Sequence, residues 1–306
     1  MELSKNSIIE SPSSLTEIVK CPICDSNSFN LKIAVKDHSI SKENFEIIQC
    51  TECNFLITSP RPADNEISKY YASEEYISHS GTKKGLINSL YHKVQKLNMN
   101  LKYRAFAKYV PRGTWMDYGA GNGAFLQYLE SKKIVCEGFE PDATARKVAS
   151  EKNISIQDSE EYKASSKQYS SITMWHVLEH IPNLNEIIQK HKSNLMPGGI
   201  LTIAVPNHKS YDESFYKDYW AAYDVPRHLW HFSEKDMQSL LKKNGFEHIK
   251  TAPMIFDSYY VSMLSEKYKG GSLIRGIMIG ALSNLKARFK KSAFSSQIYV
   301  FRKIDV

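Results

Sequence analysis

Long uncharged apolar runs are absent from this sequence of 306 residues. No run reaches the ~18 apolar residues that a membrane-spanning helix needs, and the most apolar late stretch, residues 272–285, contains Arg275. The first ten residues, MELSKNSIIE, lack the apolar core of a secretory signal, which favours a cytoplasmic protein. Ordinary proportions of apolar (42%) and charged (24%) residues exclude collagen, a coiled coil and full disorder. The length suggests about two domains.

Much of the chain carries little net positive charge. Residues 1–60 carry 5 basic and 8 acidic groups, and residues 111–255 carry 17 and 18. The net charge of +7 therefore arises from residues 61–110, with 9 basic and 4 acidic groups, and residues 256–306, with 9 and 3. Such basic segments either meet an anionic partner or form a solvated basic face.

Cysteine is scarce, but four of the five cysteines form two C-x-x-C pairs. These are Cys21-Pro-Ile-Cys24 and Cys50-Thr-Glu-Cys53. Together they supply four thiolates, the ligand set of a structural zinc ion with no open coordination position. Alternating apolar residues between the pairs predict two strands joined by a turn near residues 37–42, as in a zinc ribbon. Disulfides are disfavoured without a secretory signal, and a redox pair is disfavoured without a βαβ context.

The chain divides into four predicted parts: a disordered tail over residues 1–15, a zinc-ribbon-like module over 16–62, a helical linker or cap over 63–110, and an α/β domain over 111–306. Strand and helix patterns alternate from residue 114 onward. Strands are expected near 115–118, 135–139, 154–157, 171–175 and 200–205, and helices near 124–131, 143–152 and 184–195. This alternation predicts a doubly wound, Rossmann-like parallel sheet, which binds ligands at the carboxyl ends of its strands.

A glycine-rich loop follows the first of these strands and reads Met-Asp-Tyr-Gly-Ala-Gly-Asn-Gly over residues 116–123. Glycines at this place let the backbone approach a ligand closely and turn into a helix. Glu140 ends the second strand, where a carboxylate can accept hydrogen bonds from both hydroxyls of a ribose. Asp117 decides between nucleoside ligands, because a carboxylate beside the loop repels the pyrophosphate of a dinucleotide. It attracts the sulfonium and ammonium groups of S-adenosylmethionine.

This combination resembles the class I S-adenosylmethionine-dependent methyltransferases. The resemblance covers residues 115–250 and includes the D-x-G-x-G-x-G loop, the acidic second-strand end, the Trp-His-Val-Leu-Glu-His segment over 175–180 and a Pro-Gly-Gly turn before the fifth strand. It implies a seven-stranded sheet whose last strand is antiparallel. Asp117 and the loop would hold the methionyl part, Glu140 the ribose, and residue 158 or 159 would lie near the adenine. The implied cofactor contacts are Asp117, Gly119, Ala120, Gly121, Asn122, Gly123, Glu140, Pro141, Asp158, Trp175, His176 and His180.

The segment from His176 to His180 also matches the H-x-x-E-H pattern of a class of zinc peptidases. That pattern requires a helix that directs both histidines toward one metal. Here it begins at a strand end and is followed by Pro182, so the peptidase interpretation is disfavoured. The two histidines are expected to line the ligand cleft or to fix the loop through hydrogen bonds.

Two further histidines, His228 and His231, are candidates for the general base of methyl transfer. Their alternative role is to cap the helix expected over residues 234–243, with Ser233 as its N-cap. A two-C-x-x-C module joined to a class I domain resembles the deoxysugar C-methyltransferases, whose matching segment is E-H-x-x-Y-F-S.

In that segment His228 matches the family, whereas Arg227 replaces the glutamate and His231 replaces the tyrosine. An arginine at this place could hold an anionic substrate instead. The same resemblance implies that Tyr76 closes over the cofactor, although helix packing explains this tyrosine equally well.

The C-terminal region contains an insertion. The strand expected near residues 247–252 should pair with the last strand, 297–302, and 44 residues, 253–296, separate them. Apolar and basic residues alternate there and predict a basic amphipathic helix or helix pair. It would cover the substrate cleft, pack on the sheet, or contact a membrane surface through residues 270–291.

Taken together, these patterns favour S-adenosylmethionine-dependent methyl transfer to a small polar acceptor, a sugar or glycan precursor. An RNA-base methyltransferase is the first alternative, but the acidic cysteine module disfavours a nucleic-acid partner. A non-catalytic cofactor-binding scaffold is the second alternative, which the intact glycine loop disfavours.

Overall fold

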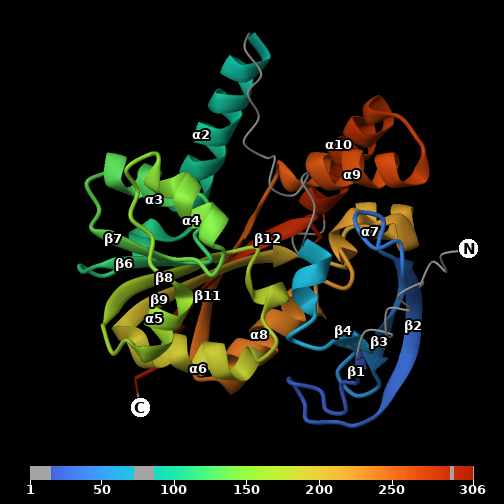
Figure 1. Cartoon of the computed structure of the whole chain (residues 1–306), viewed down its shortest axis with the longest axis horizontal. Coiled ribbons are helices and arrows are strands. Elements are labelled where there is room, and N and C mark those ends of the chain that lie inside the picture. Colours follow the sequence, from blue (N-terminus) through green and yellow to red (C-terminus); the bar gives the residue numbers. More distant parts are fainter. Residues whose placement is uncertain (1–14, 72–85, 290–292, 306) are drawn as a thin grey trace, which may run out of the picture.

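The computed structural model describes residues 15–71, 86–289 and 293–305 of the chain. The predicted disordered tail, apart from Leu15, and the predicted lid residue Tyr76 lie outside these residues. A six-stranded sheet runs through the middle of the molecule, with helices on both faces and the cysteine-containing module beside it (Figure 1). The predicted α/β fold with a small N-terminal module is confirmed.

The N-terminal module is an antiparallel sheet, as its alternating apolar residues predict. Strands β2 and β3 form the expected hairpin, and β4 pairs with β3. The carboxylate of Asp37 forms the turn between β2 and β3 by accepting hydrogen bonds from the backbone N–H groups of Ser39, Ile40 and Ser41. The strands are β1 (Leu15–Thr16), β2 (Phe29–Lys36), β3 (Asn44–Cys50), β4 (Leu56–Thr58) and β5 (Arg61–Pro62), of which β1 pairs with β5.

One strand of the module's sheet comes from a distant part of the chain. The short strand β10 (Trp230–His231) pairs antiparallel with β4, which places Trp230 opposite Ile57. The sheet order is therefore β10-β4-β3-β2. This pairing fixes the module to the segment that carries both candidate base histidines.

The central sheet has the order β11-β12-β9-β8-β6-β7. Its members are β6 (Trp115–Tyr118), β7 (Cys136–Phe139), β8 (Tyr169–Trp175), β9 (Leu195–Pro206), β11 (Phe246–Pro253) and β12 (Ser296–Lys303). Strands β7, β6, β8 and β9 are parallel, whereas β12 is antiparallel to both β9 and β11. The predicted antiparallel last strand is confirmed.

A seventh strand was expected near residues 154–157, and only one residue of it pairs. Gln157 forms a single parallel bridge with Phe139, supported by hydrogen bonds to the backbone on both sides of that residue. Strand β9 also begins earlier than expected, because the Pro-Gly-Gly turn is incorporated into the strand.

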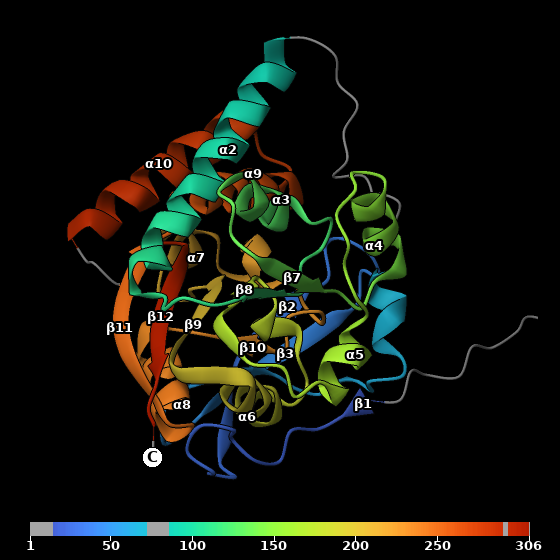
Figure 2. The same ribbon diagram turned by 90° about the vertical axis from the view of Figure 1, so that its left-hand side faces the viewer.

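Helices cover both faces of the sheet (Figures 1 and 2). On one face Phe106 and Phe125 pack with the β6 residue Trp115, and on the other Tyr162 and Ile188 pack with Tyr118. The first face carries α2 (Leu86–Phe106), α3 (Ala124–Ser131) and α4 (Ala143–Ser150), and the second carries α5 (Ser159–Ala164), α6 (Leu184–Asn194) and α8 (Glu234–Lys243).

Helix α8 begins where its sequence predicts. Ser233 caps it, and Asp236 completes a capping box by accepting a hydrogen bond from the Ser233 backbone N–H. Short helical elements fill the connections: η1 (Ile67–Tyr71), η2 (Ala107–Tyr109), η3 (Leu178–His180), α7 (Tyr211–Tyr216), η4 (Lys217–Tyr219) and η5 (Ala221–Tyr223).

The insertion before the last strand is a pair of helices, α9 (Asp257–Lys269) and α10 (Leu273–Phe289). Figure 1 places them at the outer edge of the molecule, and Figure 2 shows α10 at the edge as well. Gly276 and Gly280 allow the two helices to approach closely, because a Cβ atom on Gly276 would lie 2.6 Å from the Met263 Cα. The predicted helix pair is confirmed.

Candidate functional site

The four paired cysteines converge at one end of the N-terminal module. The Sγ atoms of Cys21 and Cys53 are 3.5 Å apart, as are those of Cys24 and Cys50, and all four lie within 4.8 Å of one another. Sulfurs around a tetrahedral zinc ion lie about 3.8 Å apart for Zn–S bonds of about 2.3 Å, so the cluster fits such an ion. The spacing is too long for disulfides, which need about 2.05 Å.

The two cysteine turns have the same backbone geometry. In each, the residue after the second cysteine donates its backbone N–H to the first cysteine's carbonyl, Asp25 to Cys21 and Asn54 to Cys50, both at 3.0 Å. Asp25 and Asn54 also share a left-handed backbone, with φ of 65° and 68°. Such tight turns bring both sulfurs of a pair to the same side, which explains why the two-residue spacing suffices.

The glycine loop between β6 and α3 takes backbone conformations that favour glycine. Gly119, Gly121 and Gly123 have φ values of 72°, 53° and 75°. A Cβ atom on Gly119 would lie 2.4 Å from a methyl group of Val177, whereas one on Gly121 would meet no atom within 4 Å. Gly119 is therefore required for packing, and Gly121 faces open space that a ligand can occupy.

Two carboxylates flank this loop at the ends of neighbouring parallel strands. Asp117 is 1% exposed, and its Oδ1 accepts a hydrogen bond of 2.5 Å from Thr173 Oγ1. Burial raises the pKa of Asp117 to about 7. Glu140 accepts hydrogen bonds from the backbone N–H groups of Gly121 and Asp142, and burial raises its pKa as well. A cationic ligand would favour the charged form of both groups.

Trp175, at the end of β8, lies in an aromatic group next to the loop. Its ring is 5.0 Å from that of Phe125 and 6.2 Å from that of Phe106. The Lys102 Nζ from α2 lies 4.6 Å from the centre of the Trp175 ring, in a cation–π contact. Burial lowers the pKa of Lys102 despite the nearby negative charges of Asp257 and Asp117.

Asp158 caps helix α5 and is bound to the neighbouring helix. It accepts a hydrogen bond from the Glu160 backbone N–H and forms an ion pair of 2.9 Å with Arg146. Arg146 also donates to the carbonyl oxygens of Glu140 and Pro141. This network holds the ends of β7 and of the Gln157 segment together beside the loop.

His176 follows β8 directly and is held by two carboxylates. Its Nδ1 lies 3.2 Å from Glu179 Oε1, and its Nε2 lies 2.9 Å from Asp257 Oδ2. Burial opposes its positive charge, but these two partners raise the pKa of His176 to about 10. The histidine is therefore a cation at neutral pH, and it fixes the loop after β8, as one of the sequence hypotheses expects.

His180, His228 and Glu179 form a compact cluster, with one ligand atom from each within 4.8 Å of the others. The two imidazole rings meet edge to face, with centroids 4.6 Å apart. Glu179 is fully buried, and its Oε2 has no hydrogen-bond partner among the described residues. Burial and the neighbouring His228 lower the pKa of His180 to about 4, so this ring is neutral at physiological pH.

Hydrogen bonds define the protonation of both rings in the cluster. The Nδ1 of His228 lies 2.9 Å from the carbonyl oxygen of Ala222, and the Nδ1 of His180 lies 3.0 Å from that of Arg227. Because a carbonyl oxygen can only accept, each Nδ1 carries the hydrogen, and each neutral ring has its lone pair on Nε2. The hydroxyl of Tyr71 also lies 3.0 Å from His180 Nδ1.

His231 occupies a different environment from His228. It lies in β10, which pairs with β4, and is 4% exposed. Its Nε2 lies 2.9 Å from Thr58 Oγ1. Burial lowers the pKa of His231 well below its usual value. The Thr58 hydroxyl in turn donates to the carbonyl oxygen of His228 at 2.7 Å. His231 thus connects the module to the cluster segment.

Arg227 is buried between the module and the domain. Its guanidinium forms ion pairs with Asp37 at 3.0 Å and Asp224 at 2.6 Å, and it also donates to the Tyr70 carbonyl oxygen and the Ser39 hydroxyl. These partners occupy its donors. The suggestion that Arg227 holds an anionic substrate therefore finds no support in its contacts.

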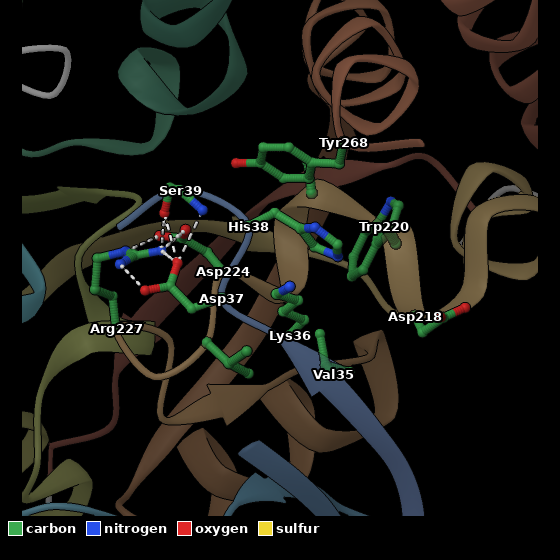
Figure 3. Close-up of a pocket in the computed structure, with 12 residues that line it drawn as sticks. Val35, Lys36, Asp37, His38, Ser39, Asp218, Trp220, Asp224, Arg227 and Tyr268 are labelled. Atoms are coloured by element: carbon green, nitrogen blue, oxygen red, sulfur yellow. Dashed lines mark hydrogen bonds and ion pairs between the residues drawn. The ribbon is translucent and has the colours of Figure 1, made fainter. Parts of the chain in front are cut away.

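A small pocket, with an accessible volume of about 10 Å³, lies where the module meets the loop after β9 (Figure 3). Arg227 borders one side, and His38 stacks between Tyr219 and Tyr268 on the other, with ring centroids 5.1 and 4.9 Å apart. The described residues that line it include none of the predicted cofactor contacts. We assign this pocket to the junction between the N-terminal module and the α/β domain.

Several residues of the site were not singled out from the sequence. Lys102, Thr173 and Asp257 reach it from α2, β8 and α9, and no local motif surrounds them. Tyr71 lies shortly before the predicted lid residue Tyr76, and Glu179 lies between His176 and His180. The H-x-x-E-H spacing did mark Glu179, although through the pattern of an unrelated enzyme class.

Comparison with known proteins agrees with this geometry. A curated relative, an uncharacterized protein of Methanocaldococcus jannaschii, is 23% identical over 154 residues, which make up 50% of this chain and 73% of the relative. Several solved methyltransferase structures share the fold.

A proposed sarcosine dimethylglycine methyltransferase from Galdieria sulphuraria has a TM-score of 0.51 at 17% identity, covering 72% of this chain and 88% of its own. Phosphoethanolamine N-methyltransferase 2 from Haemonchus contortus, in complex with S-adenosyl-L-methionine, has a TM-score of 0.50 at 15% identity, covering 89% and 71%. Magnesium protoporphyrin IX methyltransferase from Synechocystis PCC 6803, with bound SAH, also has 0.50 at 15%, covering 79% and 100%. At these identities the likeness shows the shared fold.

The family model described as a methyltransferase domain matches residues 90–251, more than half of the chain. That range contains the glycine loop, both flanking carboxylates and the histidine cluster. The chain therefore belongs to the methyltransferase domain family, as a class I S-adenosylmethionine-dependent methyltransferase.

Proposed function

We propose that this methyltransferase acts on a small, neutral, hydroxyl-rich acceptor, a sugar or glycan precursor, and that His228 takes the acceptor's proton. The observation that carries the proposal is the buried carboxylate of Glu179 beside the rings of His180 and His228. Its Oε1 pairs with His176, whereas its Oε2 has no hydrogen-bond partner among the described residues. A buried polar oxygen without a hydrogen-bond partner is costly. That cost is offset when a neighbouring histidine gains a proton during the reaction.

The proposed cofactor site follows the carboxyl ends of β6, β7 and β8. When bound, S-adenosylmethionine supplies a methyl group activated by a sulfonium. Asp117 offers the negative charge that such a ligand needs, and Gly121 leaves the space. Each Glu140 oxygen accepts one backbone hydrogen bond, which leaves each a further lone pair for a ribose hydroxyl. The other proposed contacts are Gly119, Ala120, Asn122, Gly123, Pro141, Asp158, Trp175, His176 and His180, with Tyr76 as a lid.

The proposed chemistry is a direct displacement. A bond forms between the acceptor atom and the methyl carbon, the carbon–sulfur bond breaks with its electron pair going to sulfur, and the acceptor's proton passes to His228 Nε2. Positioning provides most of the catalysis, and the base adds roughly 10²–10⁴-fold. Glu179 would stabilise the resulting imidazolium. We do not propose His231 as the base, because its Nε2 already contacts Thr58.

The groups around the cluster favour a neutral polar acceptor. Tyr71, His180 and Asp224 offer donors and acceptors for hydroxyl groups, whereas the nearby cation Arg227 is neutralised by Asp37 and Asp224. An anionic phosphate would find no unpaired arginine among these described residues. The acidic module likewise disfavours RNA, which requires clustered positive charge.

The cysteine cluster is proposed to hold one structural zinc ion. The sulfur spacing and the two matching turns support this assignment, and four thiolates leave no position for a substrate. We further propose residues 16–62 as the zinc module, 63–110 as a linker and cap, and 111–306 as the catalytic domain. The zinc would stabilise β3 and β4, and through β10 the segment that carries His228.

The test compares cofactor binding with methyl transfer. Calorimetric titration with S-adenosylmethionine, with NAD as control, should show micromolar binding of S-adenosylmethionine alone. A panel of sugars and nucleotide sugars is then screened for methyl transfer from labelled cofactor. His228→Asn should bind the cofactor normally and lose turnover, while the matched variant His248→Asn, at a half-buried histidine of β11 outside the cluster, keeps both.

Two results would reject the proposal. Transfer to a structured RNA, with binding that weakens as salt rises, would indicate the first alternative. Cofactor binding with no transfer to any acceptor in the panel or to RNA would favour the scaffold.

A further inference from the structure

Within the pair formed by α9 and α10, helix α10 is packed with small residues inside and most of its large apolar residues outside. The described side chains of α10 that are buried are those of small residues, Gly276, Gly280, Ser283 and Ala287. They recur every three or four residues and share one helix face. A Cβ atom on Gly280 would lie 2.8 Å from the Ser258 carbonyl oxygen, so α9 lies directly against this face.

The opposite face of α10 is apolar and exposed. Ile274, Met278, Leu285 and Phe289 are 72%, 65%, 51% and 85% exposed, and their spacing places them on one stripe. Leu273 and Ile277 widen it at the first turns. A helix on the surface of a globular protein normally shows the reverse arrangement, with its large apolar residues toward the core. Contiguous exposed apolar surface of this kind indicates an interaction site.

The charges beside this stripe have one sign. Helix α10 contains Arg275, Lys286 and Arg288 and no aspartate or glutamate. The region from residue 256 to the end carries 9 basic and 3 acidic groups. Helix α9 contains two acidic residues, Asp257, which binds His176, and Glu266, which is fully buried and lies 3.4 Å from Arg275. The exposed charges therefore match an anionic surface.

We propose that the exposed face of α10 docks on an anionic lipid bilayer, with its apolar stripe in the interface and its basic residues at the headgroups. This combination of apolar and basic residues on one exposed helix suits shallow insertion. A second copy of the chain is a poorer occupant, because face-to-face pairing would bring Arg275, Lys286 and Arg288 together with the same charges of the partner. None of the described helices has the length and apolar character needed to cross a bilayer, so docking would be peripheral.

The position of α9 connects this surface to the proposed site. Asp257, the first residue of α9, binds His176 Nε2 at 2.9 Å, and α9 also contacts η5, which precedes the His228 segment. If the proposed function holds, docking of α10 places the histidine cluster, where the acceptor is proposed to bind, on the membrane-facing side of the enzyme. It favours an acceptor that is itself carried by a lipid.

The experiment is flotation of the full-length protein with vesicles. Vesicles of phosphatidylcholine alone are compared with vesicles containing 30% phosphatidylglycerol, at about 50 and 500 mM salt. The wild type should float with the anionic vesicles at low salt and be largely released at high salt. Ile274→Asp/Met278→Asp should reduce the bound fraction at least 10-fold, and Lys286→Gln/Arg288→Gln should reduce it several-fold with a weaker salt dependence.

The matched control is Val135→Asp, because Val135 is 68% exposed and lies in the catalytic domain outside the helix pair. It should float like the wild type. All variants should bind S-adenosylmethionine normally, which separates this proposal from the proposed function. The proposal is overturned if the wild type does not float with anionic vesicles at low salt, or if Ile274→Asp/Met278→Asp floats unchanged. A dimer dissociated by the same substitutions, without vesicle binding, would identify a second copy as the occupant.

Discussion

The cofactor edge and the histidine cluster lie next to each other, yet they are built differently. The proposed cofactor edge takes its residues from the ends of neighbouring strands: Asp117 lies near the end of β6, and Glu140 directly follows β7. The cluster joins Glu179 and His180, after β8, to His228, which follows β9. A local motif therefore identifies the first region, while the second depends on how the cysteine-containing module, the linker and the domain pack together.

If the cluster depends on the module, the largest effect should come from the cysteines. Cys50→Ser removes one of four thiolates from a site whose metal contributes on the order of 10 kcal/mol of apparent binding free energy. We expect loss of the zinc equivalent and a melting temperature lower by roughly 10 °C or more. Metal analysis and calorimetry measure both. Cys136→Ser, at the lone cysteine, should keep its zinc, and a Cys50→Ser protein with full zinc would refute the assignment.

The next largest effect should separate the two regions within the folded enzyme. His228→Asn keeps a polar side chain but removes the base, so turnover should fall by roughly 10²–10⁴-fold. The affinity for S-adenosylmethionine should stay within about threefold, because His228 belongs to the acceptor side. Steady-state kinetics with the identified acceptor, alongside calorimetry, measures the two quantities. An equal loss of turnover and of affinity for S-adenosylmethionine would show that the cofactor edge and the histidine cluster are not functionally distinct.

At the cofactor edge, Asp117→Asn should weaken S-adenosylmethionine binding by roughly 100-fold, since a buried charge pair is lost. Asp142→Asn, at an exposed helix cap, is the matched control. In the wild type, binding should strengthen as the pH rises through about 7, where Asp117 becomes charged. Affinity that is independent of pH between 6 and 8 would contradict this role for Asp117.

The same residue should have the opposite effect on stability. The pKa of Asp117 is raised to about 7 in the folded protein, against about 3.9 in an unfolded chain. The folded state therefore binds more protons between pH 4 and 7, and this contribution to stability is lost as the pH rises through that window. Asp117→Asn should melt higher than the wild type at pH 8, with a smaller difference at pH 5. Melting curves without ligand test this.

The smallest effect concerns the contact between the module and the cluster. Thr58 donates to the His228 carbonyl oxygen and contacts His231 Nε2, so Thr58→Val leaves two buried polar groups without partners. A cost of about 1–3 kcal/mol is expected. Thr202→Val is the control, because the buried Thr202 hydroxyl has no partner among the described residues. Equal stability of the two variants in urea would argue against this contact.

Sequence reasoning was effective where chemistry and chain order coincide. The cysteine turns, the glycine loop and the N-cap Ser233 all depend on near neighbours in the chain, and the antiparallel last strand was implied by the family resemblance. It could not place Lys102, Asp257 or Tyr71, because tertiary packing alone brings these side chains to the site. It named both His228 and His231 as candidate bases, whereas the pairing of β10 with β4 directs them to different environments.

The measurement that tests the account most directly is methyl transfer by His228→Asn and Asp117→Asn at saturating S-adenosylmethionine. We predict that saturating S-adenosylmethionine restores Asp117→Asn to near wild-type turnover, because the defect of this variant is in cofactor binding. The turnover of His228→Asn should stay at least 100-fold below that of the wild type. Two results would contradict the separation of a cofactor edge from a catalytic histidine cluster. One is that saturating S-adenosylmethionine restores the turnover of His228→Asn, and the other is that Asp117→Asn turns over normally at subsaturating S-adenosylmethionine.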